Sequence, residues 1–416
     1  MRAWMLDEIG ADLRLAEVPE PTLRGGGVLV RILASHVPAY TGALLTGVRG
    51  GIPTPLVLGP GCVGRVEAVA EDVFNVRPGD VVVGSLFRSG DVVEPQEVLL
   101  GWTGVGGRGI TTEVTDGMQA RWRDGTFAER AVWPKETQIR LPGAERYPRP
   151  ERLAFLGWLS IAAEGLNRAE LRAGQTVVVL GATGQLGAAA VLVALAQGAA
   201  RVVAVGRNAE VLERLGGLDR RVRPVALTGD RGKDTTAIGR ACAEVAPEWG
   251  DEADGRIGGF GGGAAEGAAG DQSAWTAENV GAVGELGVAA GADVVIDVLG
   301  AVPSAEPTLA GFDSLRPGGT MVLVGGVRQE LPLPYGDIMR RRLTVRGSWM
   351  FPAETMLAVW RMVAAGTIDL DALDVRTVGL DDPAAALELA AATTGPAYVA
   401  LVPDSGGKVM PRNGSS

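Results

Sequence analysis

The stretch TVVVLGATGQLG, residues 176–187, decides the fold. Its first half, Thr176–Leu180, is a continuous apolar and mostly β-branched run, which is typical of a strand buried on both faces of a parallel sheet. A glycine-rich turn follows, and then segment 188–197, rich in Ala, Val and Leu, predicts a buried helix. A strand, a glycine turn and a helix in direct succession predict the first unit of a dinucleotide-binding domain.

The alternation continues after this unit. The residue patterns predict further strands at 201–205, 292–297 and 320–324 and a helix that opens at 209–215, and hence a doubly wound parallel sheet in an α/β domain. Between about 230 and 290 the alternation breaks. Segment 255–270, GRIGGFGGGAAEGAAG, has too few large side chains to offset its backbone entropy, so we predict a flexible surface excursion there and a mobile tail at 405–416.

The first 150 residues have a different pattern. Short strand-like segments at 27–34, 64–69 and 80–84 are separated by turn signals, which predicts a β-rich domain. Near the end of the chain, helices at 353–365 and 383–392 and a strand at 398–402 are expected to return to this domain. The predicted organisation is therefore a β-rich domain at 1–150, a dinucleotide-binding domain at 151–347 and a return to the first domain at 348–404.

Length, charge and cysteine content narrow the function classes. A chain of 416 residues suggests two domains, and a net charge of −10 argues against a nucleic-acid partner. No apolar run is long enough to span a membrane, and the N-terminus has no secretory pattern. The two cysteines, Cys62 and Cys242, are far apart in sequence, so we expect no disulfide framework and a reduced, cytoplasmic setting.

The glycine turn has the features of a phosphate cradle. Gly181 and Gly184 allow a tight turn and close approach of the backbone to a pyrophosphate, and Gly187 allows close helix–strand contact. The following helix N-terminus offers free N–H groups to an anion. We therefore assign cofactor contacts to this segment; the alternative is a structural turn that binds nothing. The residues assigned are Gly181, Thr183, Gly184, Gln185, Leu186 and Gly187.

The end of the second strand bears on cofactor choice. NAD-binding sites usually have an acidic residue there, whereas this chain has Gly206, Arg207 and Asn208. An arginine can make charge-assisted hydrogen bonds to a 2′-phosphate, which a carboxylate would repel. The sequence therefore favours NADPH over NADH, with these three residues at the adenosine end. The alternative is that Arg207 is only a solvated arginine at a helix start.

The order of these pieces resembles the medium-chain dehydrogenase/reductase superfamily. The resemblance covers nearly the whole chain and implies a Rossmann domain inserted into a GroES-like catalytic domain. It also implies a homodimer through the edge strand around Val345, acting on a small-molecule substrate. Besides the glycine turn, the matching stretches are residues 34–35, 55–59, 64–66, 77–80, 124–129, 297–300, 316–319 and 347–348.

The departures from the family pattern concern zinc. Where the zinc alcohol dehydrogenases of this superfamily carry their catalytic ligands, this chain has Pro38, Pro60, Gly61 and Gly157, none of which has a metal-binding side chain. Segment 85–123, in place of the structural-zinc lobe, contains no cysteine. We therefore expect no metal. The chain looks like the zinc-independent quinone oxidoreductase and enoyl reductase branch, whose glycine turn is similar to this one.

Without a metal, hydride addition to an activated C=C is less demanding than alcohol oxidation, because charge spreads onto a conjugated carbonyl. The hypothesis is therefore NADPH-dependent reduction of an enone, enoyl thioester or quinone. Tyr40 falls where the zinc enzymes have a proton-relay hydroxyl, and His36 would share its face if the segment were extended. Either could serve the substrate oxygen. Zinc-free alcohol/carbonyl interconversion and nucleotide binding without turnover are the alternatives.

Other residues are expected to line the nicotinamide side. Strand ends in open α/β sheets carry ligands, and the family pattern adds the segment after the last strand. Trp158, next to Gly157, is expected to fill the space of the metal, and Trp349 and Met350 form either an apolar wall or core. The residues assigned to the cofactor here are Gly325, Gly326, Val327, Ser348, Trp349 and Met350.

Overall fold

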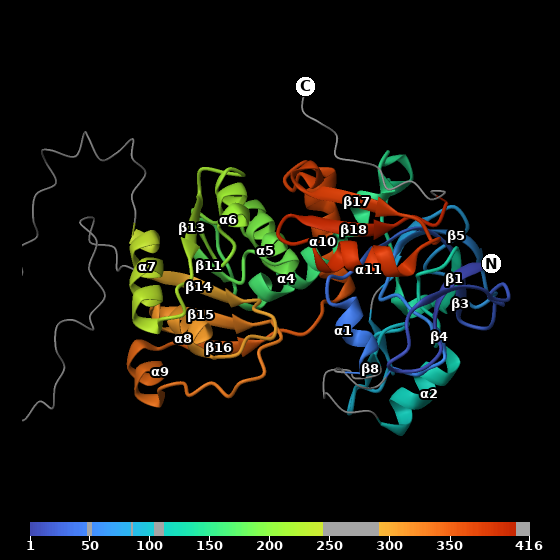
Figure 1. Ribbon diagram of the computed structural model, residues 1–416, viewed down its shortest axis with the longest axis horizontal. Coiled ribbons are helices and arrows are strands. Elements are labelled where there is room, and N and C mark those ends of the chain that lie inside the picture. Colours follow the sequence, from blue (N-terminus) through green and yellow to red (C-terminus); the bar gives the residue numbers. More distant parts are fainter. Residues whose placement is uncertain (48–51, 85, 104–111, 244–290, 405–416) are drawn as a thin grey trace, which may run out of the picture.

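The chain folds into two lobes joined by a long helix and by the C-terminal segment (Figure 1). The computed structural model describes residues 1–47, 52–84, 86–103, 112–243 and 291–404. One lobe is built on a parallel sheet and the other is β-rich, with the first and last parts of the chain in the same lobe. The predicted α/β class, a doubly wound parallel sheet beside a β-rich domain, is confirmed.

The Rossmann lobe has a six-stranded sheet in the order β13-β12-β11-β14-β15-β16, with all pairs parallel. In one half of the sheet, successive strands run outward from β11 through β12 to β13. In the other half they run outward the opposite way, from β14 through β15 to β16, so the strand order reverses between β11 and β14. Such a reversal leaves a crevice at the carboxyl ends of these two strands. The strands are β11 (Thr176–Leu180), β12 (Arg201–Gly206), β13 (Val222–Ala226), β14 (Ala292–Asp297), β15 (Leu315–Leu323) and β16 (Thr344–Gly347).

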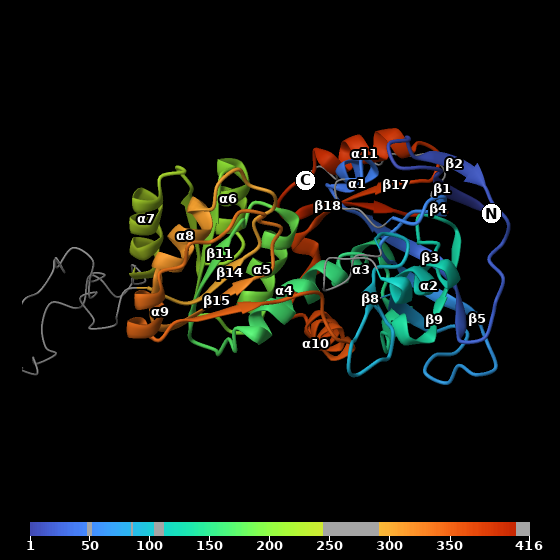
Figure 2. The same cartoon turned by 90° about the horizontal axis from the view of Figure 1, so that it is seen from below.

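Helices cover both faces of this sheet (Figure 2). Alternate residues of β11 point to opposite faces: Val177 and Val179 pack with α4, α5 and α6, and Val178 and Leu180 pack with α7, α8 and neighbouring α9. Burial on both faces explains why β11 is apolar throughout. The helices are α4 (Leu156–Arg168), α5 (Gln185–Ala196), α6 (Ala209–Gly216), α7 (Arg231–Ala243), α8 (Glu306–Asp313) and α9 (Tyr335–Arg341).

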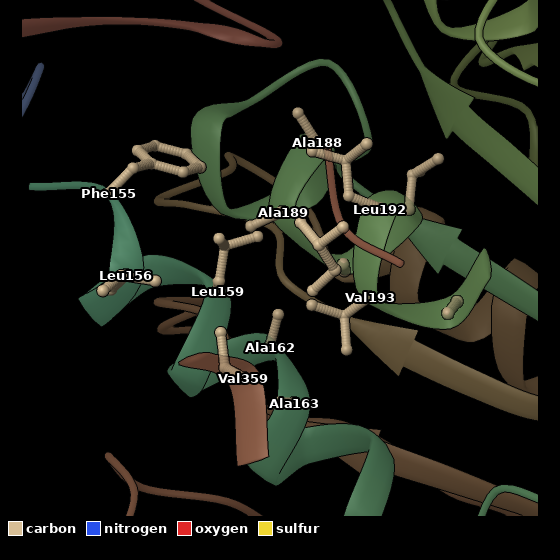
Figure 3. Packing of buried hydrophobic residues seen from close by; sticks show 14 of the residues in the cluster. Phe155, Leu156, Leu159, Ala162, Ala163, Ala188, Ala189, Leu192, Val193 and Val359 are labelled. Carbon is tan, nitrogen blue, oxygen red and sulfur yellow. The ribbon is translucent and has the colours of Figure 1, made fainter. Parts of the chain in front are cut away.

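Helix α4 joins the two lobes and packs along α5 (Figure 3). Small residues at the contact, Ala162 and Ala163 on α4 and Ala188 and Ala189 on α5, are all buried and let the two helices approach closely. Leu159 on α4 and Val193 on α5 fill the space beside them. Helix α5, which follows the glycine turn, is thereby held against α4, which joins the two lobes.

The β-rich lobe is centred on β3 (Gly27–Val37), which pairs with β5, β9 and β18. The last strand of the chain therefore completes the first domain's sheet, in the order β10-β6-β5-β3-β18-β17. The other strands are β1 (Arg2–Leu6), β2 (Arg14–Glu17), β4 (Leu56–Val57), β5 (Val63–Val69), β6 (Val81–Gly84), β7 (Phe87–Arg88), β8 (Glu97–Val98), β9 (Arg130–Pro134), β10 (Gln138–Arg140), β17 (Asp374–Val378) and β18 (Ala397–Leu401), and the helices are α1 (Thr41–Leu45), α2 (Glu113–Arg121), α3 (Pro150–Leu153), α10 (Ala353–Ala364) and α11 (Pro383–Ala391).

The first part of the excursion expected at about 230–290 is helical instead. Residues 231–243 form α7, in which Ile238 and Cys242 are buried against the sheet. Asp230 caps its start by accepting a hydrogen bond from Lys233 N–H (2.9 Å), and the buried Asp234 carboxylate in the first turn accepts from the N–H groups of Thr228 (2.8 Å) and Gly229 (3.1 Å). Segment 255–270 and the tail at 405–416 lie outside the described residues. Among the residues that are described, no helix is long and apolar enough to cross a membrane.

Candidate functional site

The glycine turn lies at the reversal point of the parallel sheet. Gly181 follows β11 with φ +83°, a left-handed conformation that favours glycine. A Cβ on Gly181 would lie 3.1 Å from the Leu299 amide nitrogen, just after β14. The turn and the 297–300 loop are therefore in contact at the crevice where doubly wound sheets bind dinucleotides.

Gly187 brings α5 close to the strand. A Cβ there would lie 2.1 Å from the Gly181 carbonyl oxygen, a distance that no side chain tolerates. The helix begins at Gln185, and the amides of its first turn have no acceptor within the helix. Free amides at a helix N-terminus are the kind of group that can hold a phosphate.

The neighbouring loops are tied to one another. Asp297 ends β14, and its carboxylate accepts hydrogen bonds from the Leu299 N–H (2.9 Å) and the Thr308 hydroxyl (2.6 Å). Burial raises the pKa of Asp297, and these two hydrogen bonds oppose the shift. Gly326 N–H donates to the Leu299 carbonyl at 2.7 Å, and a Cβ on Gly325 would lie 2.1 Å from that same oxygen. Gly325 and Gly326 are exposed beside the crevice, and Val327 packs below them.

At the adenosine end, Gly206 ends β12 under the side chain of Thr183. A Cβ on Gly206 would lie 2.4 Å from Thr183 Cγ2, so an acidic side chain has no room there unless Thr183 moves. Arg207 is exposed, and no described residue pairs with its guanidinium. Asn208 is used differently: its side-chain oxygen accepts a hydrogen bond from Val211 N–H (3.2 Å) and caps α6. Arg207 is thus the residue whose charge is free for a phosphate.

The side chains of Gln185 and Leu186 are directed into the protein. Leu186 is partly buried and packs against the hydrophobic core that is formed around β11, α4 and α5. The Gln185 side chain is buried and donates to the carbonyls of Thr393 (3.3 Å) and Ala397 (3.1 Å) in the catalytic lobe. Only their backbone N–H groups are placed for a phosphate contact.

The segment after β16 lies beside the carboxyl end of β15. Ser348 N–H donates to the Leu323 carbonyl (2.9 Å), while the buried Ser348 Oγ has no partner among the described residues. Such an orphaned hydroxyl fits a missing polar ligand. Trp349 is 50% exposed and so is not core, and Met350, at φ +53°, packs against the main core. The chemistry of the glycine turn, Arg207 and Ser348 fits a nicotinamide dinucleotide.

The residues at the family's catalytic zinc positions do not fit a metal. Pro38, Pro60, Gly61 and Gly157 offer no thiolate, imidazole or carboxylate. Over the described ranges, three or more His, Cys, Asp or Glu residues nowhere gather at metal-binding distance. Nearby Cys62 is buried, and burial raises its pKa to about 12, so its thiol is neutral. We therefore derive no step through zinc.

His36 does not face the crevice as the sequence suggested. Strand β3 ends at Val37, and the chain then turns into α1, so the alternation between residues 36 and 40 is broken. The ring is 4% exposed and lies among Phe155, Trp158 and Tyr398, with centroids 5.4–5.6 Å away. Burial lowers its pKa to about 3, and nearby Gln185 opposes this in part. Gln185 makes no hydrogen bond of ordinary geometry to the ring, so neither ring nitrogen has a partner among the described residues. A neutral imidazole in this cage is not placed to protonate a substrate.

Tyr40 is the half-buried hydroxyl of segment 35–41. The other two hydroxyls in this segment are fully buried and donate to backbone carbonyls: Ser35 to Thr126 (3.0 Å) and Thr41 to Pro38 (2.6 Å). Tyr40 immediately precedes α1, and its ring packs edge-on against Trp102 (6.0 Å) and Trp158 (6.2 Å). Of the two predicted donors, Tyr40 is partly exposed, whereas His36 is buried.

Aromatic rings form a continuous wall where zinc relatives have a metal. His36 touches Trp158, Trp158 touches Tyr40, and Tyr40 touches Trp102, all with near-perpendicular planes. A Cβ on Gly157 would have nothing within 4 Å, so the space beside Gly157 on α4 is open. The sequence pointed to Trp158 but not to Trp102, because Trp102 comes from a distant loop with no local pattern.

The fold has two domains, and the glycine turn lies at the reversal point of the parallel sheet. The model for the alcohol dehydrogenase GroES-like domain matches residues 24–143, and the model for zinc-binding dehydrogenases matches residues 273–365. Together these ranges cover about half of the chain. These matches support the medium-chain dehydrogenase/reductase superfamily, which the sequence pattern resembles and whose members are NAD(P)-dependent oxidoreductases.

Similar proteins include an NAD-dependent alcohol dehydrogenase from Sulfurisphaera tokodaii, 30% identical over 51% of this chain and 60% of the relative. D-xylulose reductase A from Aspergillus oryzae is 28% identical over 62% of this chain and 58% of the relative. The chain thus spans about 60% of the length of these curated relatives.

Solved structures resemble the whole fold. Alcohol dehydrogenase TADH from Thermus sp. ATN1 superposes with a TM-score of 0.69 at 23% identity, covering 97% of this chain and 99% of that one. A structure from Sinorhizobium meliloti 1021, described as a zinc-binding dehydrogenase bound to NADP, has a TM-score of 0.67 at 22% identity over the same shares. At these identities the likeness shows the fold alone.

Proposed function

We propose that the protein is an NADPH-dependent, zinc-independent reductase of activated C=C bonds, such as those of enones, enoyl thioesters or quinones. The observation that carries this proposal is the aromatic wall at 40, 102 and 158, which stands beside a position without metal ligands and includes one half-buried phenol. A reductase of this kind would belong to the quinone oxidoreductase and enoyl reductase branch of the superfamily. We further propose a cytoplasmic location, in keeping with the two buried free thiols.

The imidazole that packs against this wall is uncharged. His36 contacts Trp158 and is neutral because burial lowers its pKa to about 3. A planar apolar substrate can stack against Trp158 and Tyr40 with little desolvation of polar groups. This surface suits a conjugated ring or enone better than a polyol.

The cofactor would be held by the first-turn amides of α5, by Arg207 at the 2′-phosphate and by Ser348 Oγ at the nicotinamide end. When bound, NADPH supplies the hydride. The protein's part is to align the substrate and to exclude water with Trp158 and Trp349. The Tyr40 hydroxyl donates a hydrogen bond to the conjugated oxygen as negative charge develops there.

Alcohol/carbonyl interconversion is the second candidate, because similar proteins carry alcohol dehydrogenase and xylulose reductase names. A third is nucleotide binding without turnover. A substrate panel separates the three: NADPH with a cyclic enone, a quinone and a saturated ketone, and NADP⁺ with the corresponding alcohol. We expect NADPH consumption with the enone and quinone only. Turnover of the saturated ketone and the alcohol alone would favour the second candidate, and binding with no turnover would favour the third.

A further inference from the structure

A turn of the catalytic lobe rests on the cofactor-binding part of the Rossmann lobe. It comprises residues 393–397, between α11 and β18. Gln185, the first residue of α5, donates to the carbonyls of Thr393 (3.3 Å) and Ala397 (3.1 Å). These two bonds join the helix that would hold the pyrophosphate directly to the other lobe.

The same turn also touches α6, the helix that begins just after Arg207. Arg214 Nη2 lies 3.4 Å from the Pro396 carbonyl oxygen. Gly395 has φ +69°, and a Cβ there would lie 2.5 Å from Val211 Cγ1. The turn is thus fitted against both elements that follow the glycine cradle and the adenosine end.

From this turn a short path leads to the aromatic wall. Ala397 is the first residue of β18, and β18 pairs with β3 so that Ala400 lies opposite His36. Strand β3 ends at Val37, three residues before Tyr40. The Gln185 side chain also lies close to His36 itself.

We propose that Gln185 is a positioning residue, which ties the cofactor helix to β18 and so couples NADPH binding to the placement of Tyr40. This rests on the proposed function, since it assumes that NADPH binds at α5. The backbone N–H of Gln185 serves the phosphate, and its side chain serves the other lobe. Removing the side-chain amide separates these two tasks.

The test compares Gln185→Met with the unaltered protein. Methionine keeps the length and volume of the side chain but donates no hydrogen bond, so the carbonyls of Thr393 and Ala397 lose their donor. Gln197→Met is the matched control: Gln197 is at the other end of α5 and pairs with Asn167 (3.1 Å) on the surface. Amide hydrogen exchange of residues 393–401 is measured with and without saturating NADPH.

We expect NADPH to slow exchange of 393–401 by about tenfold in the unaltered protein and in Gln197→Met, and by less than about twofold in Gln185→Met. The Kd for NADPH should change by less than about twofold, while kcat falls about tenfold, as expected for a loss of about 1.4 kcal/mol. An unaltered protein that binds NADPH without slower exchange at 393–401 would overturn the proposal. So would Gln185→Met with full protection.

A replacement variant and an activity measurement complete the test. If Gln185→Met does not fold by circular dichroism, Gln185→Glu at pH 8 replaces it, because a carboxylate has the same size and cannot donate; the same loss of protection is expected. If the unaltered protein is protected by NADPH but reduces no enone, the proposed reaction is rejected while the tie through Gln185 stands.

Discussion

Replacing Arg207 with alanine tests how the cofactor is chosen. The side chain is exposed and makes no ion pair with any described residue, so its loss should leave the fold intact. A charge-assisted hydrogen bond contributes about 1.5–3 kcal/mol, and salt screening of an exposed guanidinium favours the lower end. A loss of about 1.4 kcal/mol is a tenfold change. We therefore expect the Kd for NADPH to rise about tenfold at low salt and the Kd for NADH to stay within about twofold.

Calorimetric titration of both cofactors, at low salt and at 0.5 M salt, measures this directly. Arg240→Ala is the control, because Arg240 is another exposed arginine of the Rossmann lobe, on α7, and its loss changes the net charge equally. The gap between NADPH and NADH should shrink at high salt. Equal affinity of the unaltered protein for the two cofactors would refute the phosphate argument, as would equal weakening of both in Arg207→Ala.

Three further outcomes are expected. Tyr40→Phe should lower kcat for an enone by about tenfold or more without changing the Kd for NADPH, as steady-state kinetics would show; an unchanged kcat would remove Tyr40 from the reaction. His36 is the chain's sole histidine, and its folded-state pKa is lowered from 6.5 to about 3, so its contribution to stability is present above pH 6.5 and is lost as pH falls. Between pH 6.5 and 5 the unfolding free energy should drop by about 1.5 kcal/mol more in the unaltered protein than in His36→Phe in urea titrations; parallel pH profiles would contradict a buried neutral imidazole. Gly187→Ala should destabilise the protein by about 1–3 kcal/mol and weaken NADPH binding, because its Cβ would meet the Gly181 carbonyl at 2.1 Å, while Gly239→Ala, with nothing within 4 Å, should change neither.

The local patterns predicted the Rossmann strands well. Thr176–Leu180 and Ala292–Asp297 form strands at the expected bounds, since a run buried on both faces has its signal in its own residues. Helix α5 begins at Gln185 rather than at 188, because the last residues of the glycine turn are already helical. Helix α7 was not predicted, because segment 231–243 is rich in polar residues and contains the buried Asp234.

The features of the site that the sequence could not predict depend on contacts between residues far apart in the chain. Strand β3 continues to Val37 because it pairs with β18, more than 350 residues later in the chain. That pairing buries His36. The extended segment ends at Val37, before Tyr40 is reached. The side chain of Gln185 faces the catalytic lobe because residues 393–397 fold back onto α5. No local pattern in either segment shows these neighbours.

The position to which hydride is delivered tests the central claim most directly. The protein is dialysed against a chelator, its zinc content is measured, and it is given a cyclic enone with NADPH deuterated at the transferable position. Mass spectrometry and NMR then locate the label. We expect deuterium on the β-carbon of a saturated ketone, formed by protein free of zinc. Deuterium on the carbinol carbon of an allylic alcohol, or turnover that requires stoichiometric zinc, would contradict the account.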